Sequence, residues 1–278
     1  MCFILLLMKI QYFALETDRY PIDCKMYVPD HGKSHHIVLG VHGFAGDKES
    51  SALYALAKEL TKKQGQLVCF DWPGHGKSPV DGQSLTVDNC IKDLKHMLAY
   101  CRNQFPSQKK YVFATSFGGY ITLLCKDTLM RGDTMEFQTV LRAPAVTMPQ
   151  LFLSLAGLKD ARQYRALGSI QCGFPGQREL WVPYVFFEQL QQHDVFKLDY
   201  TKQSFLVIHG KKDVTVPYED VRKFCQERRS MKLYSISGAD HRFKEEGQIQ
   251  EVVQTALRYW KIEEEHRTSA FKMTEVIR

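Results

Sequence analysis

Short apolar runs that alternate with stretches of helical spacing constrain the fold of this chain more than any other feature. The runs contain three to five residues each and lie at residues 37–41, 67–70, 111–114, 139–141 and 205–208. Runs this short and this apolar are typical of strands that are buried on both faces of a parallel sheet. Stretches with helical spacing lie between these runs and after the last one, at residues 51–61, 87–102, 120–129, 218–226 and 248–260. The alternation predicts a mostly parallel sheet flanked by helices, with right-handed crossover connections.

Two segments depart from this alternation. Residues 8–15 and 22–28 alternate apolar and polar side chains around a polar turn, which predicts an opening antiparallel hairpin. Between residues 147 and 203 there is no strong strand run, and Gly, Pro and aromatic residues are frequent. The aromatic residues are Phe152, Tyr164, Phe174, Trp181, Tyr184, Phe186, Phe187, Phe196 and Tyr200. Because a structureless loop of this length is uncommon inside a domain, we expect an inserted cap with short helices or a hairpin of its own.

We therefore expect one α/β core that is divided by a cap. The first part of the core comprises residues 1–146, the cap comprises residues 147–203, and the second part comprises residues 204–278 with a C-terminal helix and tail. The tail, residues 261–278, mixes acidic and apolar side chains. Such a tail can extend the last helix, pack on a partner or stay disordered, so the oligomeric state is open and a homodimer is one option.

Charge and cysteine content exclude several classes of function. Lys and Arg number 37 against 31 Asp and Glu, but the basic residues are scattered among acids, so no nucleic-acid binding is predicted. The eight cysteines form no C-x-x-C pair and several lie in apolar runs, which indicates reduced core cysteines of a cytoplasmic protein. The apolar stretch at residues 2–8 is far shorter than the roughly 20 residues that a membrane helix needs, so we expect neither a signal peptide nor a membrane span.

The segment around Ser116 carries the sharpest chemical signal. An apolar strand run ends at Ala114, Ser116 follows among small residues, and helical spacing begins shortly after Gly118. A strand that turns directly into a helix around one residue strains that residue, and small neighbours two positions away on either side avoid clashes. Ala114 and Gly118 meet this requirement, which makes Ser116 a candidate nucleophile. In the alternative interpretation, Ser116 only caps the helix.

A serine nucleophile needs a base to take its proton and a carboxylate to orient that base. Asp213 follows the apolar run at residues 205–208, and His241 follows a further run at residues 232–236. Because the carboxyl ends of strands in an open parallel sheet share one crevice, we expect both side chains to meet Ser116 there. Asp240 is a competing candidate for the acid, although adjacent residues on a loop rarely point at each other.

Other chemistries find no matching pattern. No histidine pair has H-E-x-x-H spacing, which argues against a zinc hydrolase. Two Gly-Lys-Ser tripeptides lack the earlier glycine of a phosphate loop, and Pro79 stands where a dinucleotide fingerprint needs a small residue. We therefore expect no cofactor and no metal. Three further histidines at strand-end turns are expected to be structural hydrogen-bond donors: His42, His75 and His209.

The chain order Ser116, Asp213, His241 is the one expected of an α/β-hydrolase triad, and four motifs resemble that superfamily. They are the oxyanion loop His42-Gly43-Phe44, the D-x-x-G-x-G-x-S loop at residues 71–78, the acid loop at residues 209–217 and the histidine loop Gly238-Ala239-Asp240-His241. The resemblance implies the α/β-hydrolase fold with an inserted cap, and it favours Asp213 over Asp240 as the acid. It also implies that the backbone N–H of Phe44 is one oxyanion donor. The N–H of Phe117, directly after the nucleophile, is the other candidate.

The HGF tripeptide, the GADH loop and a cap after the sixth strand most resemble the cinnamoyl and feruloyl esterase group of intracellular esterases. The sequence departs from the GHSQGG elbow that is common there, because residues 114–119 read Ala-Thr-Ser-Phe-Gly-Gly. The reaction type therefore follows from the resemblance, whereas the identity of the substrate does not.

Together these patterns predict a serine hydrolase that cleaves small-molecule carboxylic esters through an acyl-enzyme. An aromatic cap favours an apolar or aromatic acyl or alcohol group. In the alternative view, the aromatic residues only form the cap's own small core. The same triad also suits a thioesterase, an acyltransferase or a monoacylglycerol-type lipase. From a different class, a non-catalytic binding protein can keep this fold, although it does not need all three catalytic groups.

Overall fold

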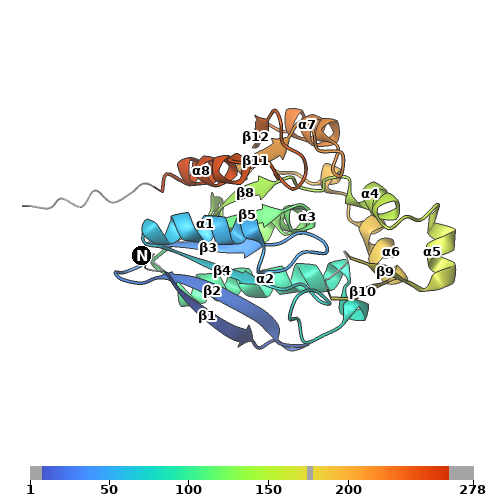
Figure 1. Ribbon diagram of the computed structural model, residues 1–278, viewed down its shortest axis with the longest axis horizontal. Helices are drawn as coiled ribbons and strands as arrows, with labels where there is room; N and C mark the ends of the chain where they lie inside the picture. The colour runs from blue at the N-terminus through green and yellow to red at the C-terminus, as the bar shows by residue number, and fades with distance from the viewer. Residues whose placement is uncertain (1–7, 174–177, 263–278) are drawn as a thin grey trace, which may run out of the picture.

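An eight-stranded sheet forms the centre of the protein (Figure 1). The computed structural model describes residues 8–173 and 178–262, so residues 1–7, residues 174–177 with Phe174, and the tail from residue 263 lie outside the described residues. The strand order is β1-β2-β4-β3-β5-β8-β11-β12. The strands are β1 Met8–Leu15, β2 Ile22–Pro29, β3 His36–Val41, β4 Gly65–Phe70, β5 Lys109–Thr115, β8 Phe137–Arg142, β11 Phe205–Gly210 and β12 Met231–Ile236.

The first two strands are antiparallel to their neighbours, and the other six are parallel to one another. Strand β1 pairs antiparallel with β2, and β2 pairs antiparallel with β4. From β4 through β3, β5, β8 and β11 to β12, every neighbouring pair is parallel. The predicted opening hairpin and the predicted mostly parallel sheet are therefore both confirmed, and each predicted apolar run lies within one strand.

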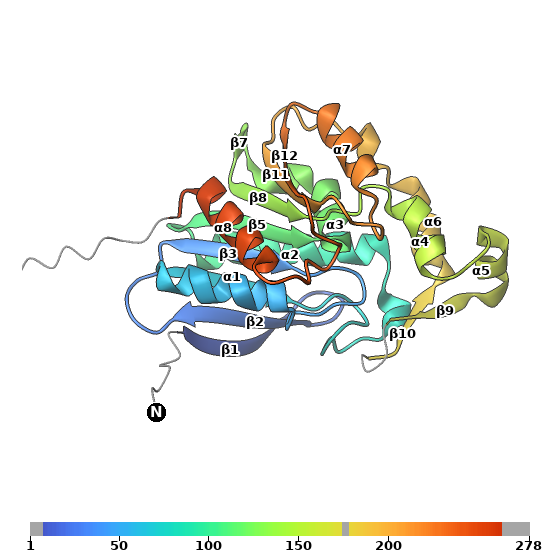
Figure 2. The ribbon, with the colours of Figure 1, turned by 45° about the horizontal axis from the view of Figure 1, so that its top comes forward.

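Helices cover both faces of this sheet (Figure 2). The alternation within β3 shows why, because Ile37, Leu39 and Val41 belong to one buried apolar cluster and Val38 to the other. Helices α1 and α8 pack with the Val38 cluster, whereas α2, α3 and α7 pack with the opposite one. The helices are α1 Ser51–Lys62, α2 Val87–Gln104, α3 Phe117–Leu124, α7 Tyr218–Gln226 and α8 Gln248–Trp260.

The residue range predicted for α3 lies too far towards the C-terminus. Helical spacing predicted residues 120–129, but α3 begins at Phe117 and ends at Leu124. The first turn contains Gly118 and Gly119, and glycine is a poor helix former, which made this turn look like part of a loop. After α3 the chain tightens into the 3₁₀ turn η2, Lys126–Leu129. A short hairpin, β6 Met130–Arg131 and β7 Thr134–Met135, then leads into β8.

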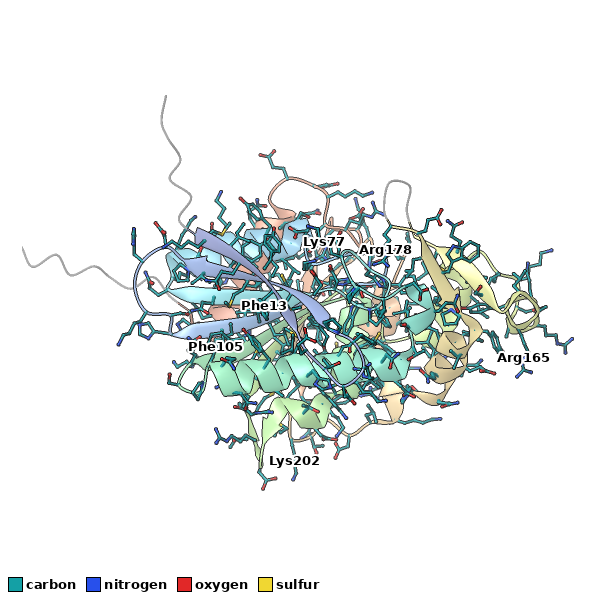
Figure 3. All side chains as sticks on the ribbon, turned by 90° about the horizontal axis from the view of Figure 1, so that it is seen from below. Phe13, Lys77, Phe105, Arg165, Arg178 and Lys202 are labelled. Atoms are coloured by element: carbon teal, nitrogen blue, oxygen red, sulfur yellow. The ribbon has the colours of Figure 1, made fainter. Side chains whose placement is uncertain are left out.

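The cap segment, residues 147–203, contains both short helices and a hairpin. Its elements are α4 Met148–Leu155, α5 Ala161–Leu167, β9 Ser169–Cys172, β10 Leu180–Pro183, α6 Tyr184–Gln192 and the 3₁₀ turn η3 Val195–Lys197. These elements lie beyond the carboxyl ends of the central strands, with Arg165 of α5 near the outer tip (Figures 1 and 3). A further 3₁₀ turn, η1 Gly82–Ser84, contacts β10. The limits of the cap at residues 147 and 203 stay a prediction.

Within the described ranges, no helix combines the length and the apolar character needed to cross a membrane.

Candidate active site

Ser116 forms the turn between β5 and α3. Its backbone has φ 51° and ψ −115°, a left-handed conformation that a non-glycine residue rarely adopts and that costs about 1–3 kcal/mol. The surroundings hold it there: Ser116 N–H donates to the carbonyl of Arg142 at 2.9 Å, and Ser116 O accepts from Tyr120 N–H and Ala145 N–H. The turn therefore presents the Ser116 side chain at the carboxyl edge of the sheet.

Close backbone approach explains the small residues around this turn. A Cβ atom added at Gly118 would lie 2.5 Å from the carbonyl oxygen of His42. A Cβ atom added at Gly43 would lie 3.1 Å from Cβ of Ser116. Ala114, on the other side of the turn, is buried. The requirement for small neighbours, inferred from the sequence, therefore has a direct steric cause at position 118.

Gly118→Ala is expected to lower the free energy of unfolding by about 1–3 kcal/mol, because the new methyl group must displace the backbone at His42. Urea denaturation measures the difference. Gly238→Ala is the matched control, because a Cβ there has its nearest neighbour at 3.6 Å, an ordinary contact. Equal stabilities for the two variants would contradict the steric argument.

The side chains of Ser116, His241 and Asp213 form one hydrogen-bonded chain. The distance from His241 Nε2 to Ser116 Oγ is 3.1 Å, and the distance from His241 Nδ1 to Asp213 Oδ2 is 2.7 Å. Asp213 lies in the loop after β11 and His241 in the loop after β12, as their places after two parallel strands predicted. The structure thus brings together the three side chains that the sequence singled out from segments up to 125 residues apart.

The Asp213 carboxylate is buried and well supplied with donors. Its Oδ1 accepts from the backbone N–H groups of Thr215 and Val216, at 2.9 and 2.8 Å, and His209 Nε2 lies 3.2 Å from Oδ2. Burial alone would favour the neutral acid, but the hydrogen bonds from His209 and His241 hold the pKa of this carboxyl well below its usual range. Asp213 is therefore charged at neutral pH.

The competing carboxylate, Asp240, has other partners. Asp240 accepts from the backbone N–H of Arg242 at 2.9 Å, and it lies 3.4 Å from Nζ of Lys244. Its side chain is 39% exposed, whereas that of Asp213 is fully buried. Among the described residues, the carboxylate that contacts His241 is Asp213 and not its sequence neighbour.

Phe44 and Phe117 lie close together at the Ser116 turn, with their rings 5.9 Å apart. Phe117 is the first residue of α3, and Phe44 follows the glycine that approaches Ser116 most closely. Within the described residues, neither backbone N–H donates a hydrogen bond. Unpaired N–H groups beside a serine hydroxyl are what an oxyanion site offers before substrate arrives.

Two buried histidines fix the loop that carries Phe44. His75 Nε2 accepts from the backbone N–H of Ala45 at 3.1 Å, while His75 Nδ1 lies 2.9 Å from the carbonyl of Pro73. Burial, together with the neighbouring His42, lowers the pKa of His75 to about 3, so the ring stays neutral and Nε2 stays an acceptor. His42 Nε2 likewise accepts from Trp72 N–H at 3.2 Å. Both rings are structural, as predicted, but at these two atoms they accept hydrogen bonds instead of donating them.

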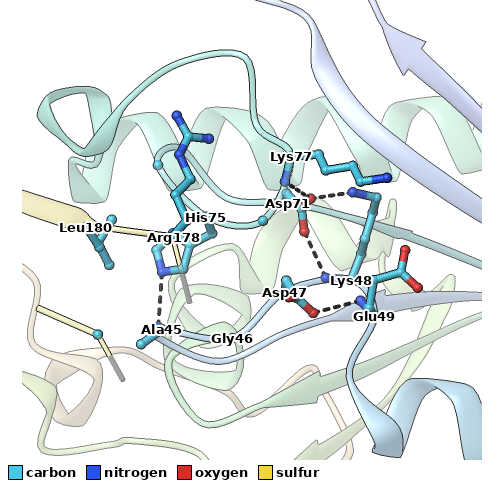
Figure 4. A pocket seen from close by; sticks show the side chains of 13 residues that line it. Ala45, Gly46, Asp47, Lys48, Glu49, Asp71, His75, Lys77, Arg178 and Leu180 are labelled. Carbon is cyan, nitrogen blue, oxygen red and sulfur yellow. Dashed lines mark hydrogen bonds and ion pairs between the residues drawn. The ribbon is translucent and has the colours of Figure 1, made fainter. Parts of the chain in front are cut away.

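A cavity of about 280 Å³ lies next to this loop (Figure 4). It is bounded by residues 45–49, residues 71–77 and the side chains of Arg178 and Leu180. Asp71 links two of these walls, since it accepts from the backbone N–H groups of Lys48 and Lys77, each at 2.8 Å. Ser116 and His241 do not line this cavity, and the contacts around it support the Phe44 loop.

An aromatic cluster joins the cap segment to both candidate oxyanion residues. The ring of Phe186 lies 6.0 Å from that of Phe44 and 5.7 Å from that of Phe117, and the ring of Phe152 lies 5.7 Å from that of Phe44. Phe152 and Phe186 are almost fully buried. These contacts agree with the alternative in which the cap aromatic residues form a packed core, and they show that this core extends onto the site.

Sequence reasoning missed Arg142. This residue ends β8, is only 7% exposed, and accepts the Ser116 N–H through its backbone carbonyl. A signal was available, because a cation directly follows the apolar run at residues 139–141 on a strand that was expected to be buried. Periodicity alone places a charged residue that follows an apolar run in the solvent beyond the strand, so it predicted no role for Arg142.

The described residues contain no group of three or more His, Cys, Asp or Glu side chains that could hold a metal ion.

Comparison with family models adds the decisive observation. Residues 32–170, half of the chain, match the model of the hydrolase family described as serine aminopeptidase, S33. The chain belongs to this family. As an S33-family α/β hydrolase, it also shows the fold that the four sequence motifs implied.

Solved structures share the α/β-hydrolase fold of this S33-family chain. Est1E from Butyrivibrio proteoclasticus, solved with ferulic acid bound, superposes with a TM-score of 0.75 at 20% identity, over 90% of this chain and 98% of that one. Alpha/beta hydrolase domain-containing protein 10 from mouse gives a TM-score of 0.71 at 14% identity, over 90% and 98%. At these identities the likeness shows the fold alone.

A curated relative is similar in sequence. Lysophosphatidylserine lipase ABHD12 of chicken, Gallus gallus, is 20% identical over 214 residues, which is 77% of this S33-family chain and 50% of the lipase. The chain therefore spans about half the length of this relative. The proteins that it resembles thus include this lipase and, among solved structures, an esterase domain from Rhodothermus marinus.

Proposed function

We propose that this protein is a carboxylesterase-type serine hydrolase that acts through an acyl-enzyme. Ser116 is the nucleophile, His241 is the general base and then the general acid, and Asp213 orients the imidazole. The observation that carries the proposal is the hydrogen-bonded chain from Ser116 Oγ through both nitrogens of His241 to Asp213, with distances of 3.1 and 2.7 Å. A hydroxyl, an imidazole and a buried carboxylate in this order are the groups that acyl transfer to serine requires.

In the proposed reaction each group has one role. His241 Nε2 takes the hydroxyl proton as Ser116 Oγ attacks the ester carbonyl, and the carbonyl oxygen becomes an oxyanion beside the N–H groups of Phe44 and Phe117. His241 then gives the proton to the leaving alcohol, and the acyl group stays on Ser116. Water attacks this acyl-enzyme with His241 again as base, which releases the acid and restores the hydroxyl. Asp213, ionised throughout, stabilises the imidazolium that forms twice in the cycle.

We expect the acyl group of the substrate to be apolar. The half-buried Phe44 follows Gly43, which approaches Ser116 closely, and the cap rings of Phe152 and Phe186 pack on the Phe44 ring. Flat apolar walls bind apolar or aromatic groups with few polar contacts. Est1E, which shares this fold, was solved with ferulic acid, an aromatic acid, and this supports the same class of acyl group here.

Phe186→Ala is expected to shift substrate preference towards longer acyl chains, because it removes the ring that packs on both Phe44 and Phe117. The ratio of initial rates on p-nitrophenyl hexanoate and acetate should rise about tenfold, the effect expected for extra apolar room in a pocket. The free energy of unfolding should fall by about 3–5 kcal/mol through cavity formation.

Phe187→Ala is the control for this variant. The ring of Phe187 packs on Phe152, Tyr164 and Tyr184 of the same cluster, away from the two oxyanion residues. It should lose a similar amount of stability without a change in the hexanoate-to-acetate ratio. A parallel change in both variants would show that Phe186 does not limit the acyl site.

A lipase is the second candidate, favoured by the sequence similarity to the chicken lysophosphatidylserine lipase. The proposed triad and oxyanion donors suit a lipid ester equally well, and a thioesterase or acyltransferase would use the same groups. Initial rates on short aryl esters, long-chain monoglycerides and acyl thioesters separate these possibilities. Turnover of the thioester alone would contradict the ester assignment.

Labelling with a fluorophosphonate probe tests the proposed function directly. The native protein is expected to form one covalent adduct, which mass spectrometry of proteolytic peptides should locate on Ser116. Heat-denatured protein is the control, because labelling depends on the assembled triad. Absence of an adduct on the native protein, or an adduct on another residue, would contradict the proposal.

We also propose a cytoplasmic location. The seven cysteines within the described residues are all free thiols, and six of them are buried. Unpaired cysteines at this frequency are typical of a reducing compartment. Whether the protein forms a homodimer stays open.

A further inference from the structure

Arg142 connects the nucleophile turn to the histidine loop. Its backbone carbonyl accepts the N–H of Ser116 at 2.9 Å. Its guanidinium Nη2 donates to the carbonyls of Arg242, at 3.0 Å, and of His241, at 3.3 Å. One residue therefore contacts the backbone of both the proposed nucleophile and the proposed base.

The guanidinium also supports a strained residue in the histidine loop. Phe243 has φ 57°, a left-handed conformation that is unfavourable for a residue of its size. The guanidinium carbon of Arg142 lies 4.5 Å from the centre of the Phe243 ring, within the range of a cation–π interaction. The loop thus keeps an unfavourable backbone conformation two residues after His241, where the Arg142 guanidinium packs on the Phe243 ring.

The charge of Arg142 is costly where it lies. Among the described residues, no carboxylate oxygen comes within 4.0 Å of the guanidinium, and its Nε is buried without a hydrogen-bond partner. Burial lowers the pKa of this guanidinium to about 10, although the charges of Asp213 and Asp240 partly oppose the change. A buried cation without a close counter-ion is destabilising, and an apolar side chain of similar volume often stabilises such a position. The two carbonyl hydrogen bonds and the ring contact offset this cost, so the net contribution of Arg142 to folding is expected to be small.

We propose that Arg142 is a positioning residue that holds the His241 loop in register with the Ser116 turn. This inference rests on the proposed function, because it assigns the residue to the geometry of the proton transfer from Ser116 Oγ to His241 Nε2. The two carbonyl contacts and the ring contact fix the loop on the β8 side. Without them the imidazole can drift, and a displacement of about 1 Å in a reacting pair costs on the order of 100-fold in rate.

Arg142→Met tests this inference. It replaces the guanidinium with an apolar chain of similar length, so the free energy of unfolding is expected to stay the same or to rise. We expect kcat on a p-nitrophenyl ester to fall about 10- to 100-fold with KM within about twofold, because substrate contacts are unchanged while the reacting groups are misaligned. Hydrogen–deuterium exchange of the peptide covering residues 237–246 should become about tenfold faster, with other peptides unchanged.

Arg228→Met is the matched control. Arg228 also donates to two backbone carbonyls, those of Phe196 and Phe224, and its guanidinium lies 4.3 Å from the centre of the Phe224 ring. It lies in a different loop, away from Ser116, and its loss is expected to leave kcat unchanged.

The inference is overturned if Arg142→Met keeps the wild-type kcat and exchange rates, or if Arg228→Met loses kcat to the same extent. Should Arg142→Met fail to fold, Arg142→Gln, which keeps a polar N–H in the same space, is measured with the same criteria. If the wild type hydrolyses no ester, the proposed function fails, and the exchange of residues 237–246 in the variant still decides whether Arg142 holds this loop.

Discussion

Ser116→Ala is expected to lower kcat on a p-nitrophenyl ester by about 10⁶-fold and to abolish fluorophosphonate labelling, because loss of a triad nucleophile removes the covalent route as a whole. The proposed oxyanion donors, the N–H groups of Phe44 and Phe117, are retained, so a residual rate about 10³-fold above that in water is expected. Steady-state kinetics with enzyme concentrations in the micromolar range measure both the loss in kcat and the residual rate.

The fold should be unaffected by this change. Ser116 Oγ contacts His241 Nε2, and the backbone contacts that hold φ at 51° are made by the main chain, which alanine retains. The free energy of unfolding should therefore stay within about 0.5 kcal/mol of the wild type. Ser204→Ala, an exposed serine whose hydroxyl contacts Tyr259, is the control and should keep full activity. More than about 1% residual activity in Ser116→Ala would point to a different nucleophile.

Most of the sheet was predictable because burial on both faces leaves a simple pattern. Strands β3, β5 and β11 have almost every residue buried, so an unbroken apolar run identifies each one. Amphipathic spacing likewise gave α7 and α8 with their observed limits. The start of α3 was not predictable in this way, because the two glycines that its first turn needs for steric reasons have low helix propensity.

The cap segment and its aromatic residues were only partly predictable. Composition indicated an insertion, and both a hairpin and short helices formed there. Periodicity could not decide whether Phe152 and Phe186 would be exposed to substrate or packed together, because that depends on contacts with Phe44 and Phe117 more than 30 residues away in sequence. The contacts of Arg142 were not predictable for the same reason, since its partners lie about 100 residues away in the histidine loop.

Asp213→Asn is expected to lower kcat by about 10⁴-fold while leaving the fold intact. An amide can accept the backbone N–H groups of Thr215 and Val216 through its oxygen, as Oδ1 of the carboxylate does. Its NH₂ group then replaces Oδ2 opposite His241 Nδ1, and a donor there favours the tautomer that carries its proton on Nε2. In that tautomer the imidazole cannot accept the hydroxyl proton of Ser116, so the nucleophile is not activated. Initial rates at pH 7 to 9 measure the loss.

Asp240→Asn separates the role of the buried carboxylate from a general effect of negative charge near the histidine. Each variant removes one carboxylate, Asp213→Asn from the loop after β11 and Asp240→Asn from the loop after β12. Asp240 is partly exposed and pairs with Lys244, so its loss should change kcat by no more than about twofold. If Asp240→Asn lowered kcat more than Asp213→Asn, the acid would be the sequence neighbour of His241. That result would contradict the proposal that Asp213, in the loop after β11, orients the imidazole. A large loss for Asp213→Asn alone would tie catalysis to the buried carboxylate that four donors keep ionised.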